Sequence, residues 1–137
     1  MTDDFDIQKA GAIFIHDRKV LAVRDRGEDR FMTPGGKCED GETLISCLLR
    51  EVREEVSVEI DIDSVELLGS FHGITASAHK KKIRIDAFLI GEYSGSIEPS
   101  SEIEEVCWVD TSMTSLKLGS ILEHNIMPLL KQRDLID

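Results

Sequence analysis

The spacing of apolar residues in this chain predicts several β-strands. Two apolar runs, residues 10–15 and 20–23, flank the polar residues 16–19, which have the length of a hairpin turn. Residues 83–90 alternate between apolar and polar positions, which is typical of a half-buried strand. The predicted strands are residues 10–15, 20–23, 65–74, 83–90 and 106–109.

Two other segments have the periodicity of helices. Leu44, Leu48, Val52 and Val56 recur every fourth residue, so residues 43–56 are expected to form an amphipathic helix, with Thr43 as its N-cap. Residues 116–130 also have helical spacing, although the proline at position 128 should bend or shorten that helix. Strands on both sides of a central helix, with a second helix at the end, predict an α/β sandwich with a mixed sheet.

Composition limits the number of domains. The chain has 137 residues, of which 41% are hydrophobic, and this is the usual size and apolar content of one compact domain. No repeat, linker or low-complexity segment interrupts the pattern. We therefore expect one domain over residues 1–137.

The net charge of −11 narrows the class of ligand. Such a charge disfavours an electrostatic grip on DNA or RNA, so binding of bulk nucleic acid is not expected. A small phosphorylated ligand would need metal ions or local basic residues to offset the repulsion.

The three cysteines, Cys38, Cys47 and Cys107, are widely spaced and odd in number, so we expect reduced thiols without a disulfide framework. The first eight residues lack a basic segment followed by an apolar run, so no signal peptide is expected. No apolar run approaches the length of about 20 residues that crosses a bilayer, so no membrane partner is expected. These features favour a cytoplasmic protein.

The predicted helix over residues 43–56 carries an acidic cluster. Glu51, Glu54 and Glu55 have spacings of three and four residues, which place their carboxylates close together on the helix. A glycine-rich loop, residues 25–41, leads directly into this helix. Taken alone, the cluster is also compatible with a solvated charged face, so the residues before it decide the interpretation.

Those residues complete a longer pattern. Gly36 is followed after five residues by Glu42, and then after seven residues by the segment 50–58, Arg-Glu-Val-Arg-Glu-Glu-Val-Ser-Val. This resembles the Nudix box of the Nudix hydrolases, G-x5-E-x7-R-E-U-x-E-E-x-G-U, in which U is an aliphatic residue. One defining position differs, because Ser57 stands where the family has glycine. We expect a left-handed conformation at Ser57, which need not abolish activity.

The resemblance implies a Nudix-type α/β/α sandwich over the whole chain. It also implies hydrolysis of a nucleoside diphosphate linked to another moiety, through attack of water on phosphorus, with Mg²⁺ bound and Mn²⁺ as a substitute. Such ions prefer oxygen ligands. The resemblance makes Glu54 and Glu55 the leading metal ligands, Glu51 a ligand or the general base, and the Gly36 carbonyl a further ligand.

Other residues take supporting roles by the same resemblance. Arg50 is expected to orient a carboxylate of the box and Glu42 to brace the loop against the helix, although each is equally compatible with an ordinary surface salt bridge. Many Nudix enzymes have one more glutamate downstream, and either Glu102 or Glu105 resembles it. Basic residues near the loop are candidates for binding substrate phosphates, namely Arg24, Arg26, Arg30 and Lys37. The lysines at 80–82 are better interpreted as a solvated hairpin tip.

The favoured function is a Nudix hydrolase acting on a nucleoside triphosphate or a nucleotide sugar. The alternatives are a Nudix-fold nucleotide sensor without turnover and an acidic protein-interaction domain. The expected partner is a small nucleotide, and the sequence leaves open its identity, the general base, the phosphorus attacked and whether the chain forms a homodimer.

Overall fold

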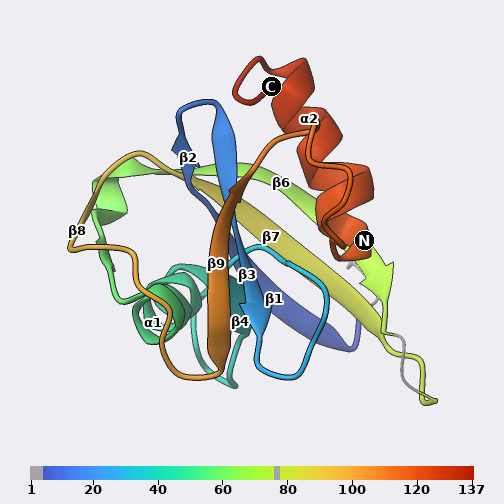
Figure 1. Ribbon diagram of the computed structural model, residues 1–137. Coiled ribbons are helices and arrows are strands. Elements are labelled where there is room, and N and C mark those ends of the chain that lie inside the picture. Colours follow the sequence, from blue (N-terminus) through green and yellow to red (C-terminus); the bar gives the residue numbers. More distant parts are fainter. Residues whose placement is uncertain (1–4, 76–77) are drawn as a thin grey trace.

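The computed structural model describes residues 5–75 and 78–137 (Figure 1). Residues 1–4, part of the segment in which no signal peptide was expected, lie outside the described residues. The strands are β1 (Ile7–Ile13), β2 (Ile15–His16), β3 (Lys19–Asp25), β4 (Gly35–Lys37), β5 (Glu59–Ile60), β6 (Val65–Ile74), β7 (Lys82–Ile90), β8 (Tyr93–Ser94) and β9 (Ile103–Val109). The helical elements are α1 (Leu44–Val56), the 3-10 turn η1 (Ile62–Ser64), the π-helical turn η2 (Leu122–Ile126) and α2 (Met127–Gln132).

The main sheet is mixed, as the sequence predicted. Its strand order is β4-β1-β7-β6, in which β1 and β7 are parallel and the other neighbours are antiparallel. A second sheet has the order β2-β3-β9, and β5 pairs with β8 in a third. The β2–β3 hairpin closes at Asp17 and Arg18, both with positive φ, which is the conformation of the turn that best suits the twist of two strands.

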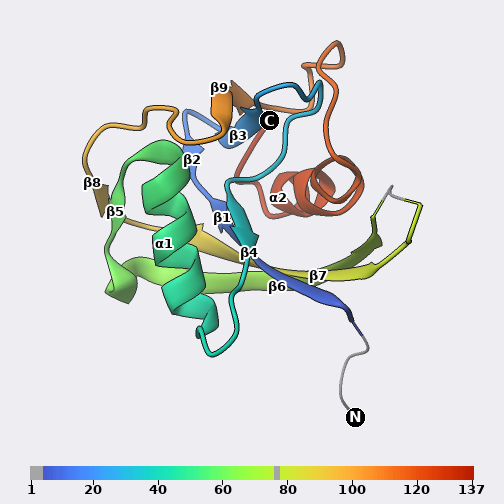
Figure 2. The ribbon, with the colours of Figure 1, turned by 90° about the horizontal axis from the view of Figure 1, so that it is seen from below.

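Two hydrophobic cores lie on either side of the central strands. Alternate residues of β1 and β3 face the core that contains α1, namely Ala10, Ala12, Leu21 and Val23. The intervening residues Ile13, Val20 and Ala22 face the core that contains α2. Figure 2 shows α1 and α2 on opposite sides of β1 and β4. The arrangement is the expected α/β/α sandwich.

The predicted central helix is confirmed at both ends. The Thr43 hydroxyl accepts a hydrogen bond from the Ser46 amide at 3.1 Å, which is the N-cap interaction. The helix ends at Ser57, which has the left-handed conformation with φ 67° and ψ 22°. The Ser57 hydroxyl also donates to the carbonyl of Glu98 at 3.2 Å. Serine therefore occupies the expected glycine position without displacing the end of the helix.

Two sequence predictions about loops and helices are wrong. Residues 25–41 were predicted as a continuous loop, but Gly35–Lys37 forms β4 because β1 offers it an antiparallel edge. The C-terminal helix was predicted to begin at residue 116, but helical turns begin at Ser120. The residues before Ser120 bond instead to Phe31, whose amide donates to the Lys117 carbonyl and whose carbonyl accepts from Gly119.

Pro128 has the effect that its chemistry predicts. The amide of Met127 bonds to the Leu122 carbonyl, five residues back, so a π-helical turn precedes Pro128. Proline has no amide hydrogen to donate and is tolerated in the first turn of a helix, where it stands in α2.

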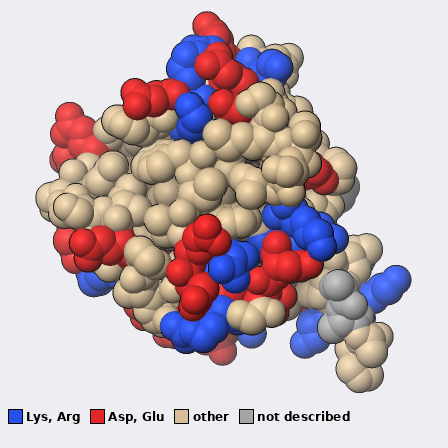
Figure 3. Space-filling model, viewed as in Figure 1, with Lys and Arg blue, Asp and Glu red and all other residues tan. Residues whose placement is uncertain are grey.

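The surface carries charges of both signs. Figure 3 shows acidic and basic side chains intermixed on one face, with an uncharged band between the charged regions. Among the described residues, no helix is long and apolar enough to cross a membrane.

Candidate active site

Four carboxylates line one cavity of about 240 Å³, whose wall includes residues of β1 and β4. Glu51 and Glu55 come from α1, Asp25 from the end of β3, and Glu102 from the turn before β9. Glu51 and Glu55 are among the few buried charged residues of the described chain. The cavity therefore brings four carboxylates together, two of them buried and two, Asp25 and Glu102, exposed.

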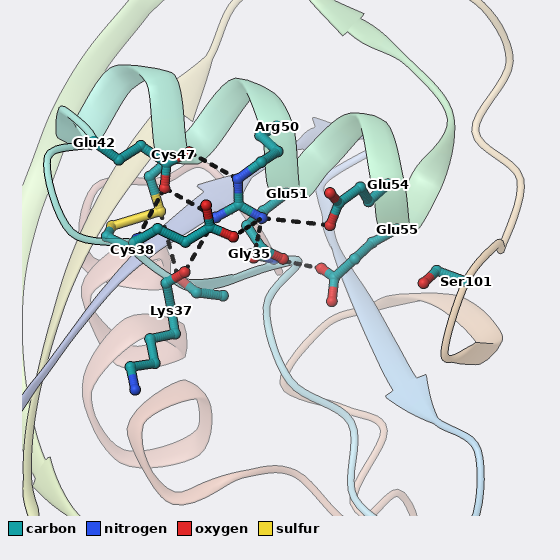
Figure 4. Close-up of polar contacts among 12 residues, drawn as sticks. Gly35, Lys37, Cys38, Glu42, Cys47, Arg50, Glu51, Glu54, Glu55 and Ser101 are labelled. Carbon is teal, nitrogen blue, oxygen red and sulfur yellow. Dashed lines mark hydrogen bonds and ion pairs between the residues drawn. A yellow bond between two sulfur atoms is a disulfide. The ribbon is translucent and has the colours of Figure 1, made fainter.

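Glu55 is the most deeply buried of these four groups, with 5% of the residue exposed. One carboxylate oxygen accepts a hydrogen bond from the Gly35 amide at 2.7 Å (Figure 4). Burial raises the pKa of Glu55 to about 8, and the negative charges of Glu51, Glu102 and Asp25 act in the same direction. In the protein alone, the carboxyl of Glu55 therefore keeps its proton at neutral pH.

Glu51 is held by Arg50. The guanidinium donates to Glu51 Oε1 at 2.9 Å and to Glu42 at 2.7 and 2.9 Å, and it also reaches the Lys37 carbonyl at 3.2 Å. Burial raises the pKa of Glu51 while Arg50 opposes that rise, and Arg50 lowers the pKa of Glu42 to about 2. Arg50 thus joins the loop after β4 to the carboxylate that faces the cavity, in the arrangement expected of a supporting residue (Figure 4).

The resemblance makes Glu51 a metal ligand or the general base, so we predict that Arg50→Lys lowers kcat/KM by about 10- to 100-fold, the usual cost of losing a group that orients such a residue. A lysine ammonium cannot reproduce the planar fork that bonds Glu42 and Glu51 together. Steady-state hydrolysis rates, with the nucleotide that the wild-type protein cleaves most efficiently, measure the effect. The control is Arg53→Lys on the same helix, because Arg53 pairs with the exposed Glu59 and does not line the cavity. Equal rates for both variants would contradict the orienting role.

The structure separates the two downstream glutamates. Glu102 lines the cavity, and its pKa is lowered first by the Ser101 hydroxyl, which donates to it at 2.6 Å, and further by a hydrogen bond with Glu55. Glu105 lies on β9 and pairs with Arg24 at 3.2 Å, outside the cavity. Of the two candidates, Glu102 is therefore the one that the fold brings to Glu51 and Glu55.

Glu54 differs from its neighbours on α1. Its side chain is 51% exposed, lies 3.4 Å from Arg50 and does not line the cavity. Two of the three helix glutamates, not all three, therefore face the same space.

The arginines that the sequence suggested for phosphate binding have other partners. Arg24 pairs with Glu105 and lies over the ring of Phe31. Arg26 pairs with Glu104 at 3.3 Å. Arg30 donates to the Leu118 carbonyl at 3.0 Å and lines a second, larger cavity. None of the three lines the cavity with the carboxylates.

Two lysines do line that cavity, Lys37 on β4 and Lys9 on β1. The sequence suggested Lys37, but Lys9 and Asp25 were missed. Two features of the sequence could have indicated these residues. Lys9 directly precedes an apolar strand, and Asp25 is a carboxylate at the end of another strand. Burial raises the pKa of Asp25, and the charge of Lys9 opposes that rise.

A larger cavity of about 550 Å³ adjoins the first. Its walls are mainly apolar and include Met32, Ile83 and Ile121. Asn125, on the π-helical turn η2, supplies a polar group. The two cavities share four lining residues, so they form one continuous cleft; these are Lys9, Met32, Thr33 and Ile85.

The carboxylates suit a divalent cation in chemical type. Mg²⁺ is usually bound by one or two protein carboxylates, with waters and substrate phosphates completing the ligands. Glu51 and Glu55 fit that requirement, and a cation bound there would stabilise the ionised form of the buried Glu55. Within residues 5–75 and 78–137, no three His, Cys, Asp or Glu side chains converge tightly enough to hold a metal ion by themselves.

The prediction that all cysteines are reduced is wrong. Cys38, in the loop after β4, forms a disulfide with Cys47 on α1, and Cys107 is the free thiol. Figure 4 shows this disulfide beside Arg50. Cys47 Sγ lies 3.6 Å from the Gly36 carbonyl oxygen. The bond ties the loop to the helix beside the carboxylates. It also removes the cysteine part of the argument for a cytoplasmic protein, because disulfides are rare in that compartment.

Reduction of this disulfide should lower the free energy of unfolding by about 2–3 kcal/mol, since a loop of this length gains that much entropy in the unfolded chain. Denaturant unfolding with and without a thiol reductant, in a Cys107→Ser background, measures the change. Alkylation of the unfolded wild-type chain should modify one thiol before reduction and three after it. Identical unfolding midpoints would show that the bond contributes nothing to stability.

The chain is similar in sequence to known proteins. A family model for the NUDIX domain matches residues 7–130. A "MutT-like protein" of Streptomyces ambofaciens is 26% identical over 125 residues, which are 90% of this chain and 76% of that protein.

Two solved structures share the fold. A MutT NUDIX hydrolase from Burkholderia pseudomallei has a TM-score of 0.71 at 21% identity, with 92% of this chain and 96% of that chain covered. The NUDIX domain of Shewanella oneidensis NrtR, complexed with ADP ribose, has a TM-score of 0.71 at 16% identity, with 96% and 90% covered. At these identities the likeness concerns the fold.

Proposed function

Because the chain belongs to the Nudix family and is a Nudix pyrophosphohydrolase, we propose that its substrate is a nucleoside triphosphate or a nucleotide sugar and that hydrolysis requires Mg²⁺ or Mn²⁺. The observation that carries this proposal is one cleft with two parts, a cavity lined by four carboxylates and a larger apolar cavity beside it. A polyphosphate needs cations at carboxylates, and a nucleoside needs an apolar cavity with a few polar groups.

The proposal assigns residues to the metal. Glu51 and Glu55 would hold it, and the Gly36 carbonyl is the further candidate. Glu54 can join them only after its side chain leaves Arg50. Bound divalent cations neutralise phosphate oxygens and acidify a water molecule.

The remaining chemistry belongs to side chains of the cleft. Arg50 fixes Glu51 against the loop, and Gly35 fixes one oxygen of Glu55. A carboxylate must accept the proton of the attacking water, and Glu51 is our first choice because α1 and Arg50 hold it at the cavity. Glu102 is the second choice, since it lines the same cavity.

The larger cavity supports a nucleotide as the substrate class. Its apolar walls can cover the faces of a base, and Asn125 can exchange hydrogen bonds with a base edge. The ADP ribose bound by the Shewanella oneidensis domain, which shares the fold, is consistent with a ligand of this size and chemistry. The proposal takes residues 1–137 as one Nudix domain.

A panel of nucleoside triphosphates, nucleotide sugars and ADP ribose tests the function. Release of phosphate or pyrophosphate, or of two monophosphates, should require Mg²⁺ or Mn²⁺ and stop in excess chelator. Hydrolysis in ¹⁸O-labelled water should place the label in a phosphate product. Label on a sugar carbon would exclude attack at phosphorus. Tight binding without turnover of any compound would favour the sensor alternative.

A further inference from the structure

Lys9 lies at the junction of the two cavities. It is one of the four residues that line both, and it is the charged one among them. Alternation along β1 explains its direction: Ala10 and Ala12 face the core with α1, so Lys9 and Gly11 face the cleft. β1 pairs with β4 on one side and with β7 on the other, so hydrogen-bonded strands hold the backbone at Lys9 from both sides.

The ammonium group of Lys9 makes no close polar contact with the described protein, and its charge acts on Asp25 only at longer range. No ion pair within 4 Å and no side-chain hydrogen bond involves Lys9 among the residues that the structure describes. In contrast, Arg24, Arg26 and Arg30 all bond to acidic groups or carbonyls of the protein. Of the basic residues near the cleft, Lys9 thus combines partial burial with a charge that lacks a bonded partner in that part of the chain.

The position of Lys9 also has a cost. It stands directly opposite Lys37 in the antiparallel pairing of β1 and β4, and both lysines line the smaller cavity. Like charges directly opposite each other on neighbouring strands destabilise a sheet. The nearby carboxylate of Asp25 offsets part of this repulsion, and a phosphate bound between the cavities would offset more of it.

We propose that Lys9 binds the substrate phosphate nearest the nucleoside, a role that rests on the proposed function. In this arrangement the nucleoside lies in the larger cavity and the reacting phosphates lie at the carboxylates. The phosphate attached to the nucleoside must then lie at the junction of the two cavities, beside Lys9. The ammonium donates to its oxygens, whereas the carboxylates beyond it require cations. Lys9 therefore sets the position of the polyphosphate along the cleft.

The test uses Lys9→Met, which keeps the aliphatic part of the half-buried side chain and removes only the ammonium. Lys9→Arg restores a cation, and Lys9→Gln serves as a second neutral variant if the methionine variant does not fold. Lys19→Met is the control of equal charge change, because Lys19 lies 4.0 Å from Asp110 and lines neither cavity. Each variant is first checked by thermal unfolding.

Binding is measured by calorimetry in excess chelator with AMP, CMP, GMP and UMP and with the four parent nucleosides. For the monophosphate that binds wild type best, Lys9→Met should weaken binding about 10- to 100-fold, as expected for a lost hydrogen bond to a charged group. Binding of its nucleoside should stay unchanged, Lys9→Arg should recover most of the loss, and Lys19→Met should match wild type. If no monophosphate binds measurably, KM for the substrate found in the panel replaces this readout and should rise by a similar factor.

Other outcomes overturn the assignment. An equal loss for monophosphate and nucleoside, or no rescue by arginine, would make Lys9 a residue of the fold alone. Unchanged binding and unchanged KM in Lys9→Met, with wild type active, would refute the role of Lys9 and leave the proposed function intact. Wild-type protein that neither binds nor hydrolyses any nucleotide would instead refute the proposed function.

Discussion

Glu55→Gln should lower kcat by at least about 100- to 1000-fold, the effect typical of removing one group that stabilises charge in the transition state. Glu55 is the most buried carboxylate of the cavity. An amide has the same shape but supplies no negative charge to a divalent cation, so the metal would be held more weakly. Phosphate or pyrophosphate release at saturating Mg²⁺ measures the loss.

The fold should survive this change. The amide oxygen of glutamine can still accept the hydrogen bond from the Gly35 amide, and the substitution removes a charge that burial and neighbouring carboxylates disfavour. Thermal unfolding in chelator should therefore occur at the same or a higher temperature than in wild type.

Two companion variants sharpen this result. Glu59→Gln, at an exposed residue paired with Arg53, should retain full activity. Glu54→Gln should cost less than Glu55→Gln, because Glu54 does not line the cavity. Full activity of Glu55→Gln, or activity in excess chelator, would overturn the metal assignment.

Alanine at the adjacent glycines should have two different effects. At Gly36, a Cβ would lie 2.5 Å from Glu51 Oε2 and 2.6 Å from its Cδ. The end of a flexible side chain can move, so Gly36→Ala should fold. The displaced carboxylate would leave its place at Arg50, and a shift of about 1 Å can cost about 100-fold in rate. We expect a loss of that size in kcat.

Gly35→Ala should instead strongly destabilise the fold. Gly35 has φ +138°, and a Cβ there would overlap the Ala10 carbonyl oxygen and lie 2.9 Å from Gly11 Cα. These are backbone atoms of the central strand β1, which cannot move aside. The combined strain and overlap should cost about 3–5 kcal/mol of stability.

Denaturant unfolding and kcat, measured for both alanine variants, separate the two effects. Gly36→Ala with normal kcat would show that the position of Glu51 does not control turnover. A Gly35→Ala protein as stable as wild type would show that β4 is not held tightly against β1.

The bounds of the central helix could be predicted from local sequence alone. Three features depend only on residues close in the chain. They are the apolar residues at every fourth position from Leu44 to Val56, the Thr43 N-cap and the left-handed conformation of Ser57. The box from Gly36 to residue 58 is equally local, and it identified the family and the α/β fold correctly. Helices bond residues four apart, so a short window contains most of the information that they need.

Which residues face the cleft depends on how distant segments of the chain pack together. Asp25, Glu51 and Glu102 come from three separated segments, and Lys9 joins them through pairing of β1 with β4 and β7. No local pattern distinguishes Glu102 from Glu105, because both lie in one acidic run and only the register of β9 against β3 turns Glu105 toward Arg24.

The same reason explains the other errors. β4 is a strand of two glycines and a lysine, which has little strand propensity, and it forms because the edge of β1 is available to it. The turn before Ser120 is set by bonds to Phe31, and the pairing of Cys38 with Cys47 depends on where the loop meets α1. Strand partners, loop contacts and disulfides join residues distant along the chain, so the free energy that selects them comes from the assembled fold and is absent from any short segment of sequence.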